Sequence, residues 1–108
     1  MTGAAPEYLT EWPDNTFTET ILKPQNGKMD YVLDYTDSGR YAIFIKDISS
    51  KESEQYVEEL KNNGYSEIHS NADDTAAGTM LESDYAYLSI SYSDDVLGIL
   101  ITLRDDTK

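Results

Sequence analysis

The feature that most constrains this chain is an alternation of side chains with a period of two, on both sides of a short turn. Residues 29–35 and 41–46 form the two arms, and residues 36–40 lie between them with Gly39 near the end. A period of two is the spacing of a β-strand, whose successive side chains point to opposite faces. Gly39 can adopt the positive φ that a tight turn needs. The pattern therefore predicts a β-hairpin.

The second half of the chain repeats this spacing. Residues 77–81 and 86–92 have strand character, and residues 82–84 and 93–95 carry turn residues. Residues 96–103 are apolar on both faces, which is typical of a central strand. These segments predict a three-stranded meander. Two shorter strands are predicted at Tyr65–His69, followed by a polar loop at residues 70–75, and at Thr16–Leu22, an edge strand before Pro24.

One helix is predicted between the two halves. Ser49 and Glu52 have the spacing of a capping box, and residues 51–63 have helical character up to Gly64. A narrow apolar stripe runs along this segment, formed by Tyr56, Val57 and Leu60. A helix of this length is marginal alone in water, so it must pack on the sheet.

These elements predict an α+β fold, a mainly antiparallel sheet with a single helix packed on one face. The length of 108 residues suits one domain. We expect a flexible lead-in over residues 1–15, with Trp12 docking on the domain, a single α+β domain over 16–104, and a charged tail over 105–108.

Charge and cysteine content exclude several classes of function. The net charge is −13, from 21 acidic and 8 basic residues, and there is no cysteine. A strongly acidic surface repels phosphate backbones, so we expect no nucleic-acid partner. No apolar run reaches the roughly 20 residues of a membrane span, so we expect no direct membrane insertion. Thiolate metal sites and catalytic thiols are excluded.

The sequence contains no recognisable catalytic motif. His69 is the only histidine, and none of the usual serine nucleophile motifs or phosphate-binding glycine motifs is present. Carboxylate pairs carry no information in a chain with 21 acidic residues. We predict no catalytic residue, no cofactor and no enzymatic activity.

Calcium binding is an alternative that the aspartates leave open. Asp73, Asp74, Asp94 and Asp95 lie in two predicted loops, where carboxylates could bind calcium. No segment has EF-hand spacing, and turn chemistry explains Asp at these positions without a metal. We therefore predict no metal-binding residue, and keep a calcium-dependent accessory domain or a small enzyme as an alternative.

The tyrosines are the most suggestive residues for binding. Tyr85 and Tyr87 alternate with the apolar face of the meander and precede Ser89 and Ser91. Outward rings beside hydroxyl groups could bind a sugar or a peptide, although such rings also stiffen a sheet by cross-strand packing. With Trp12, they are our predicted ligand-binding residues.

The chain resembles a family of small bacterial domains of unknown function, found in secreted or lipid-anchored proteins of Gram-positive gut anaerobes. The resemblance extends from Trp12 to Leu103 and rests on these motifs: Trp12-Pro13-x-Asn15, Asp37-Ser38-Gly39-Arg40-Tyr41, Tyr56-x-x-x-Leu60-Lys61-x-x-Gly64-Tyr65, Leu88-x-Ile90-x-Tyr92 and Gly98-Ile99-Leu100-Ile101. It implies an extracytoplasmic location, in a secreted or cell-envelope-anchored protein. The sequence lacks the signal segment and the lipid-accepting cysteine of anchored members, so anchoring does not follow from it.

The function most consistent with these observations is a non-catalytic extracytoplasmic binding or interaction module. Its partner would be an unknown protein, peptide or glycan. The alternatives are the metal-dependent accessory domain or small enzyme, and a structural spacer domain.

Overall fold

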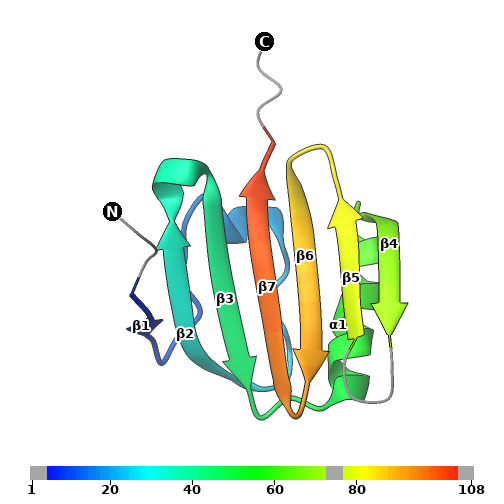
Figure 1. The fold of residues 1–108 in the computed structure, drawn as a ribbon, viewed down its shortest axis with the longest axis horizontal. Coiled ribbons are helices and arrows are strands. Elements are labelled where there is room, and N and C mark those ends of the chain that lie inside the picture. Colours follow the sequence, from blue (N-terminus) through cyan, green and yellow to red (C-terminus); the bar gives the residue numbers. More distant parts are fainter. Residues whose placement is uncertain (1–4, 73–76, 105–108) are drawn as a thin grey trace.

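The protein is one seven-stranded antiparallel sheet with a single α-helix on one face, as Figure 1 shows. The computed structural model describes residues 5–72 and 77–104. The predicted α+β class is confirmed. Asp73, Asp74 and the predicted tail over 105–108 lie outside the described residues.

The elements follow one another along the chain with short connections. The strands are β1 (Glu7–Tyr8), β2 (Lys28–Tyr35), β3 (Arg40–Lys46), β4 (Ser66–Ala72), β5 (Ala77–Glu82), β6 (Ala86–Ser93) and β7 (Val96–Leu103); the helix is α1 (Ser50–Lys61), and the 3₁₀ turns are η1 (Thr18–Thr20) and η2 (Thr36–Ser38). The order across the sheet is β1-β2-β3-β7-β6-β5-β4. The last strand is therefore the middle one, as its two apolar faces predict.

The predicted hairpin is present as β2 and β3. Tyr35 pairs with Arg40, and η2 closes the turn with Gly39 at φ 73°. A register shift between Met29 and Tyr31 interrupts the alternation of β2. Because of this bulge, Met29 lies opposite Ile45, on the other face from Tyr31.

The helix begins as its capping box predicts. The Ser49 hydroxyl accepts a hydrogen bond from the Glu52 amide at 3.1 Å, and the Glu52 carboxylate accepts one from the Ser49 amide at 3.0 Å. The helix ends at Lys61, two residues before the predicted end at Asn63. Its buried side chains are Tyr56, Val57 and Leu60, which form the predicted stripe, and also Ser53.

The core lies between the sheet and α1. It is built mostly from branched aliphatic side chains of the central strands, among them Ile43, Ile45, Leu88, Ile90, Leu97, Ile99 and Ile101. Burying each such side chain stabilises the fold by about 1.5–3 kcal/mol. We call this side of the sheet the covered face.

The segment before β2 covers the rest of this face. The Phe17 ring stacks on Tyr41 with centroids 5.2 Å apart. The Tyr56 hydroxyl donates to the Leu22 carbonyl at 2.6 Å, and the Tyr65 hydroxyl donates to the Thr20 carbonyl at 3.0 Å. These contacts attach the segment to β3, to the middle of α1 and to the residue just before β4.

The predicted edge strand at Thr16–Leu22 is wrong, because the chain turns there into η1. The Asn15 side-chain oxygen accepts hydrogen bonds from the amides of Phe17 and Thr18, at 2.9 and 3.0 Å. Such an Asn turn competes with strand pairing. The first strand is instead β1, within the predicted lead-in over residues 1–15, where Leu9 and Trp12 also pack against the core.

The fourth strand is longer than predicted. It runs from Ser66 to Ala72, through the first part of the predicted loop at residues 70–75. Cross-strand pairing with β5 continues to Ala72 and Ala77, and this pairing holds polar residues that have weak strand propensity of their own.

Candidate functional site

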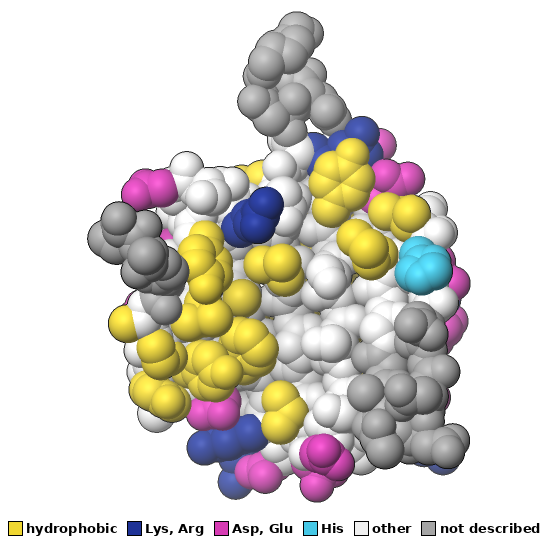
Figure 2. All heavy atoms as spheres, viewed as in Figure 1, with side chains coloured by type: hydrophobic (Ala, Val, Ile, Leu, Met, Phe, Trp, Pro, Cys, Tyr) yellow, Lys and Arg dark blue, Asp and Glu magenta, His cyan; other side chains and the backbone are white. Residues whose placement is uncertain are grey.

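Among the described elements, no helix or strand lies over the face of the sheet opposite α1, which Figure 2 shows, and we call it the open face. Over β1, β2 and β3 it presents a group of large apolar side chains. Tyr31 stacks on Phe44 with centroids 4.5 Å apart, and Tyr8 lies 5.5 Å from Tyr31. We define the aromatic patch as Tyr8, Tyr31, Leu33, Tyr35, Phe44 and Leu100.

A glycine lets the patch lie flat on the sheet. Gly98 is the β7 residue opposite Phe44. A Cβ at Gly98 would lie only 3.2 Å from the Phe44 Cε1 atom, closer than ordinary packing. The same row continues with Ser91 and Gly78, so small residues follow one another across β6 and β5.

The open face is also unusual in charge. Among the described residues that the strand register places on it, Glu82 alone has a carboxylate, whereas Lys28, Arg40 and Lys46 are cationic. The whole chain has a net charge of −13. In Figure 2 the acidic side chains gather towards the margins of this view. The open face is therefore the apolar and cationic side of an acidic protein.

Tyr87, one of the predicted ligand-binding residues, lies on the open face. Its side chain is 38% exposed, and the Arg104 guanidinium lies 5.0 Å from its ring centroid. Arg104 also donates to the Ser83 carbonyl at 2.9 Å and lies 3.7 Å from the Glu82 carboxylate. These contacts hold the ring in place beside the small residues of β6.

Tyr85 borders a different surface. It is 70% exposed and lines a hollow of about 330 Å³ with Leu60 and Tyr65, beside the end of α1. The predicted pair of tyrosines is thus exposed, but the two residues line different parts of the surface.

Trp12, the third predicted residue, is half-buried at the opposite end of β2 and β3. It lines a hollow of about 710 Å³ with Met29 and three lysines, Lys23, Lys28 and Lys46. The structure therefore does not bring Trp12 together with Tyr85 and Tyr87. The lysines around it carried no signal in the sequence, because they come from three separate segments.

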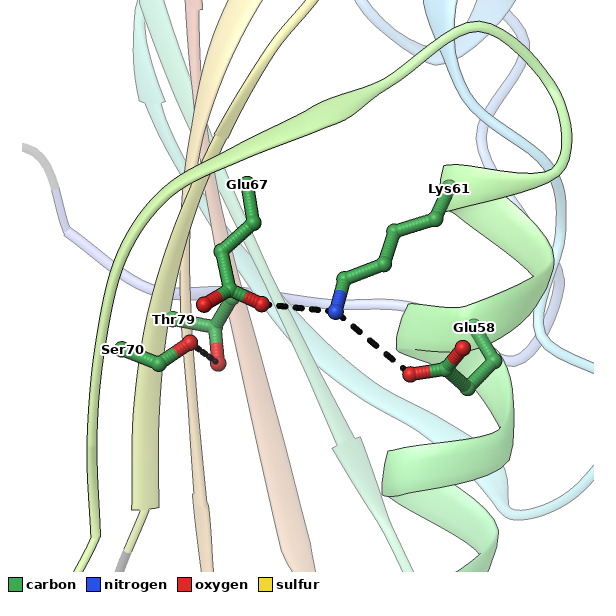
Figure 3. Close-up of polar contacts among 5 residues, drawn as sticks. All are labelled: Glu58, Lys61, Glu67, Ser70 and Thr79. Atoms are coloured by element: carbon green, nitrogen blue, oxygen red, sulfur yellow. Dashed lines mark hydrogen bonds and ion pairs between the residues drawn. The ribbon is translucent and has the colours of Figure 1, made fainter.

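A groove of about 350 Å³ separates α1 from β4 and β5. Figure 3 shows the Lys61 ammonium between two carboxylates, 2.6 Å from Glu67 and 3.5 Å from Glu58. Lys61 holds the pKa of Glu67 below its usual value, and Glu67 in turn raises the pKa of Lys61. The Ser70 hydroxyl donates to Thr79 at 3.1 Å. These groups satisfy one another, which is the arrangement of a structural contact.

Of the predicted candidates, Asp94, Asp95 and His69 lie within the described residues, and there they form no metal site. Asp94 and Asp95 have φ of 50° and 66° and form the two-residue turn between β6 and β7, a backbone role that Asp tolerates well. His69 lies within β4, opposite Met80. Within residues 5–72 and 77–104, no three His, Asp or Glu side chains form a group that could hold a metal ion.

Sequence reasoning missed the aromatic patch, although its signal was visible. The predicted alternation already separated Tyr31, Leu33 and Tyr35 from Val32, but it does not say which of the two faces a helix covers.

In the described part of the chain no helix is long and apolar enough to span a membrane.

Comparison with known proteins gives no assignment. The family resemblance noted above stays a prediction, because no protein-family model, no curated protein and no solved structure matches this chain.

Proposed function

We propose that this protein is a non-catalytic interaction module that binds its partner through the open face. The observation that carries the proposal is the composition of that face: stacked aromatic rings and cations, with one carboxylate among the residues that the strand register places there. In a chain with 21 acidic residues, an apolar face nearly without carboxylates is a departure from the rest of the surface.

This composition matches what binding surfaces require. Interfaces are enriched in Tyr, Phe and Arg and depleted in Asp, Glu and Lys, so the aromatic patch is the expected centre and Lys28 and Lys46 belong to its rim. Contiguous exposed apolar patches on small proteins mark binding sites. The rings of the aromatic patch are already packed against one another, so little side-chain entropy is lost when a partner covers them. A peptide, a glycan or a protein surface without excess positive charge fits this face.

We extend the proposal to an extracytoplasmic location. The family resemblance alone supports this part.

The test is an NMR amide titration of the full chain with peptide pools, cell-wall fragments and oligosaccharides. We expect chemical-shift changes clustered on β2, β3 and β7. Tyr8→Ser should weaken the binding about five- to tenfold, because loss of one well-placed interface aromatic costs on the order of 1 kcal/mol.

Tyr85→Ser is the matched control, since Tyr8 and Tyr85 are 71% and 70% exposed. It removes a ring of equal exposure from another surface and should leave binding unchanged. A loss of binding in Tyr85→Ser but not in Tyr8→Ser would move the site to the hollow beside α1. An absence of clustered shifts with every probe would favour the spacer function instead.

A further inference from the structure

The hollow beside Trp12 concentrates positive charge in an acidic protein. Lys23, Lys28 and Lys46 are three of only 8 basic residues in the chain, and all three line this hollow. The dark blue side chains at the lower left of Figure 2 show part of this concentration, below the aromatic patch. The volume of about 710 Å³ is within the usual range of small-molecule sites.

The strand register places two of these charges against each other. Lys28 and Lys46 are directly opposite residues of β2 and β3. Like charges at opposite positions destabilise a strand pair, and a carboxylate at either position would replace this repulsion with attraction. A local arrangement that works against stability is typical of a binding site.

Neighbouring carboxylates neutralise this charge only in part. Lys28 lies 4.0 Å from the Asp47 carboxylate, and both side chains are largely exposed. Among the described residues, neither Lys23 nor Lys46 forms an ion pair. Glu11 also lines the hollow and would oppose a bound anion.

Trp12 supplies an apolar wall to the same hollow. It packs against the core, which fixes its position, and Met29 lies beside it in the lining. An aromatic side chain and three ammonium groups in the lining of one hollow suit a ligand that combines a ring with a negative charge.

We propose that this hollow binds a small sugar that carries an anionic group, a carboxylate or a phosphate. The sugar ring lies against Trp12, and the anionic group lies between Lys28 and Lys46. This site does not include the aromatic patch, although two of its lysines, Lys28 and Lys46, also lie on the open face.

The single tryptophan of the chain lies in the hollow, so its fluorescence reports directly on the site. The full chain is titrated with digalacturonate, glucose 6-phosphate, maltose and inorganic phosphate. We expect a saturable change with digalacturonate or with glucose 6-phosphate, and the stronger of the two identifies the anionic group. Maltose and inorganic phosphate, which lack the charge and the ring respectively, should bind at least about fivefold more weakly, the loss of one good contact.

Lys46→Gln should weaken binding about fivefold, the effect of losing one good surface ion pair. Its melting temperature should stay the same or rise, because the repulsion from Lys28 is removed. Lys51→Gln is the matched control: it makes the same change of charge on α1, outside the hollow, and should leave the affinity unchanged. Glu11→Gln should tighten binding about twofold, since it removes an opposing charge.

Four results would overturn the proposal. The first is the absence of a saturable change with either anionic sugar up to about 10 mM, where a Kd of 1 mM would be nearly saturated. The second is equal binding of maltose and digalacturonate, and the third is equal binding of inorganic phosphate and glucose 6-phosphate. The fourth is an equal loss of affinity in Lys46→Gln and Lys51→Gln. The Tyr8→Ser variant should bind these sugars normally, so failure at the hollow is distinguishable from failure at the open face.

Discussion

The two faces of the sheet share the same strands but are built from different residues. On β7, Ile99 and Ile101 point to the covered face, whereas Gly98 and Leu100 point to the open face. On β3, Ile43 and Ile45 face the helix, and Phe44 faces the other way. The covered face therefore carries branched aliphatics, and the open face carries aromatics beside small residues.

The difference follows from what each face packs against. Branched aliphatics fill the narrow space under a helix, where every atom finds a neighbour. On the open face no layer lies above, so rings pack sideways, as Tyr31 does on Phe44. Stability is therefore concentrated on one face, which leaves the other free to carry binding residues.

The strongest test of this comparison uses two adjacent residues. Ile99→Ala should lower the free energy of unfolding by about 2–5 kcal/mol, because Ile99 is fully buried under α1. Leu100→Ala should cost only about 1–2 kcal/mol, because Leu100 is half-buried on the open face. Urea denaturation at neutral pH measures both. Equal losses would show that the open face contributes as much stability as the covered face.

A second test addresses the segment that completes the covered face. Tyr56→Phe removes the hydrogen bond to the Leu22 carbonyl and should cost about 1 kcal/mol at pH 7. Burial raises the pKa of Tyr56 far above its usual value near 10. The folded state therefore keeps a proton that the unfolded state loses, and stability falls as the pH rises above about 10, by up to about 1.4 kcal/mol per pH unit.

The Phe variant lacks this contribution, so its stability should fall less steeply in that pH range. Unfolding free energies at pH 7, 10 and 11 separate the loss of the hydrogen bond from the change in pH dependence. A Tyr56→Phe slope as steep as that of the natural protein would argue against a buried, protonated Tyr56.

The smallest change in stability is expected at the margin of the covered face, where the Lys61 side chain links α1 to β4. Lys61→Gln should let the pKa of Glu67 rise towards its usual value. The lowered pKa of Glu67 stabilises the fold at pH values above the usual pKa of a Glu side chain. This contribution is lost as the pH falls through the lowered pKa of Glu67. The variant should therefore melt slightly below the natural protein at pH 7, and the two should converge in acid.

Carboxyl-carbon NMR titration measures the pKa of Glu67 directly. Lys51→Gln changes the same charge elsewhere on α1 and should leave that pKa in place. If both variants raise it equally, the cause is the general field of the protein rather than the contact at 2.6 Å.

The strands and the helix were predictable because their signals are local. The capping box at Ser49 and the alternation of β3 and of β2 from Tyr31 to Tyr35 depend only on neighbours in sequence, and both are confirmed. The predicted place of Met29 on the same face as Tyr31 is wrong, because the bulge shifts the register there. The two-residue strand β1 has no such signal, since its pairing with β2 depends on the rest of the sheet. The turn at Asn15 was missed because the apolar residues after it resemble a strand.

The candidate sites were less predictable, for a physical reason. The outward position of Tyr87 was predicted from the alternation of its own strand. The aromatic patch is instead formed by Tyr8, Tyr31 and Phe44 from three strands. Beside Trp12, Lys28 and Lys46 meet only through the register of β2 and β3, and Lys23 joins them from the segment before β2. A site assembled by tertiary contacts leaves no pattern in any one segment.

The central position of β7 has a consequence for how the protein acquires its structure during synthesis. The ribosome makes β1, β2 and β3 first, then α1 and the other strands, while the strand that joins β3 to β6 comes after all of them, as the colours of Figure 1 show. Until β7 emerges, any partial sheet that β3 or β6 forms has an unpaired inner edge, and such edges are prone to aggregation. The final step closes contacts that are distant in sequence, which makes folding slow compared with a helical protein of this size. Cooperative folding must therefore wait for the last strand to leave the ribosome.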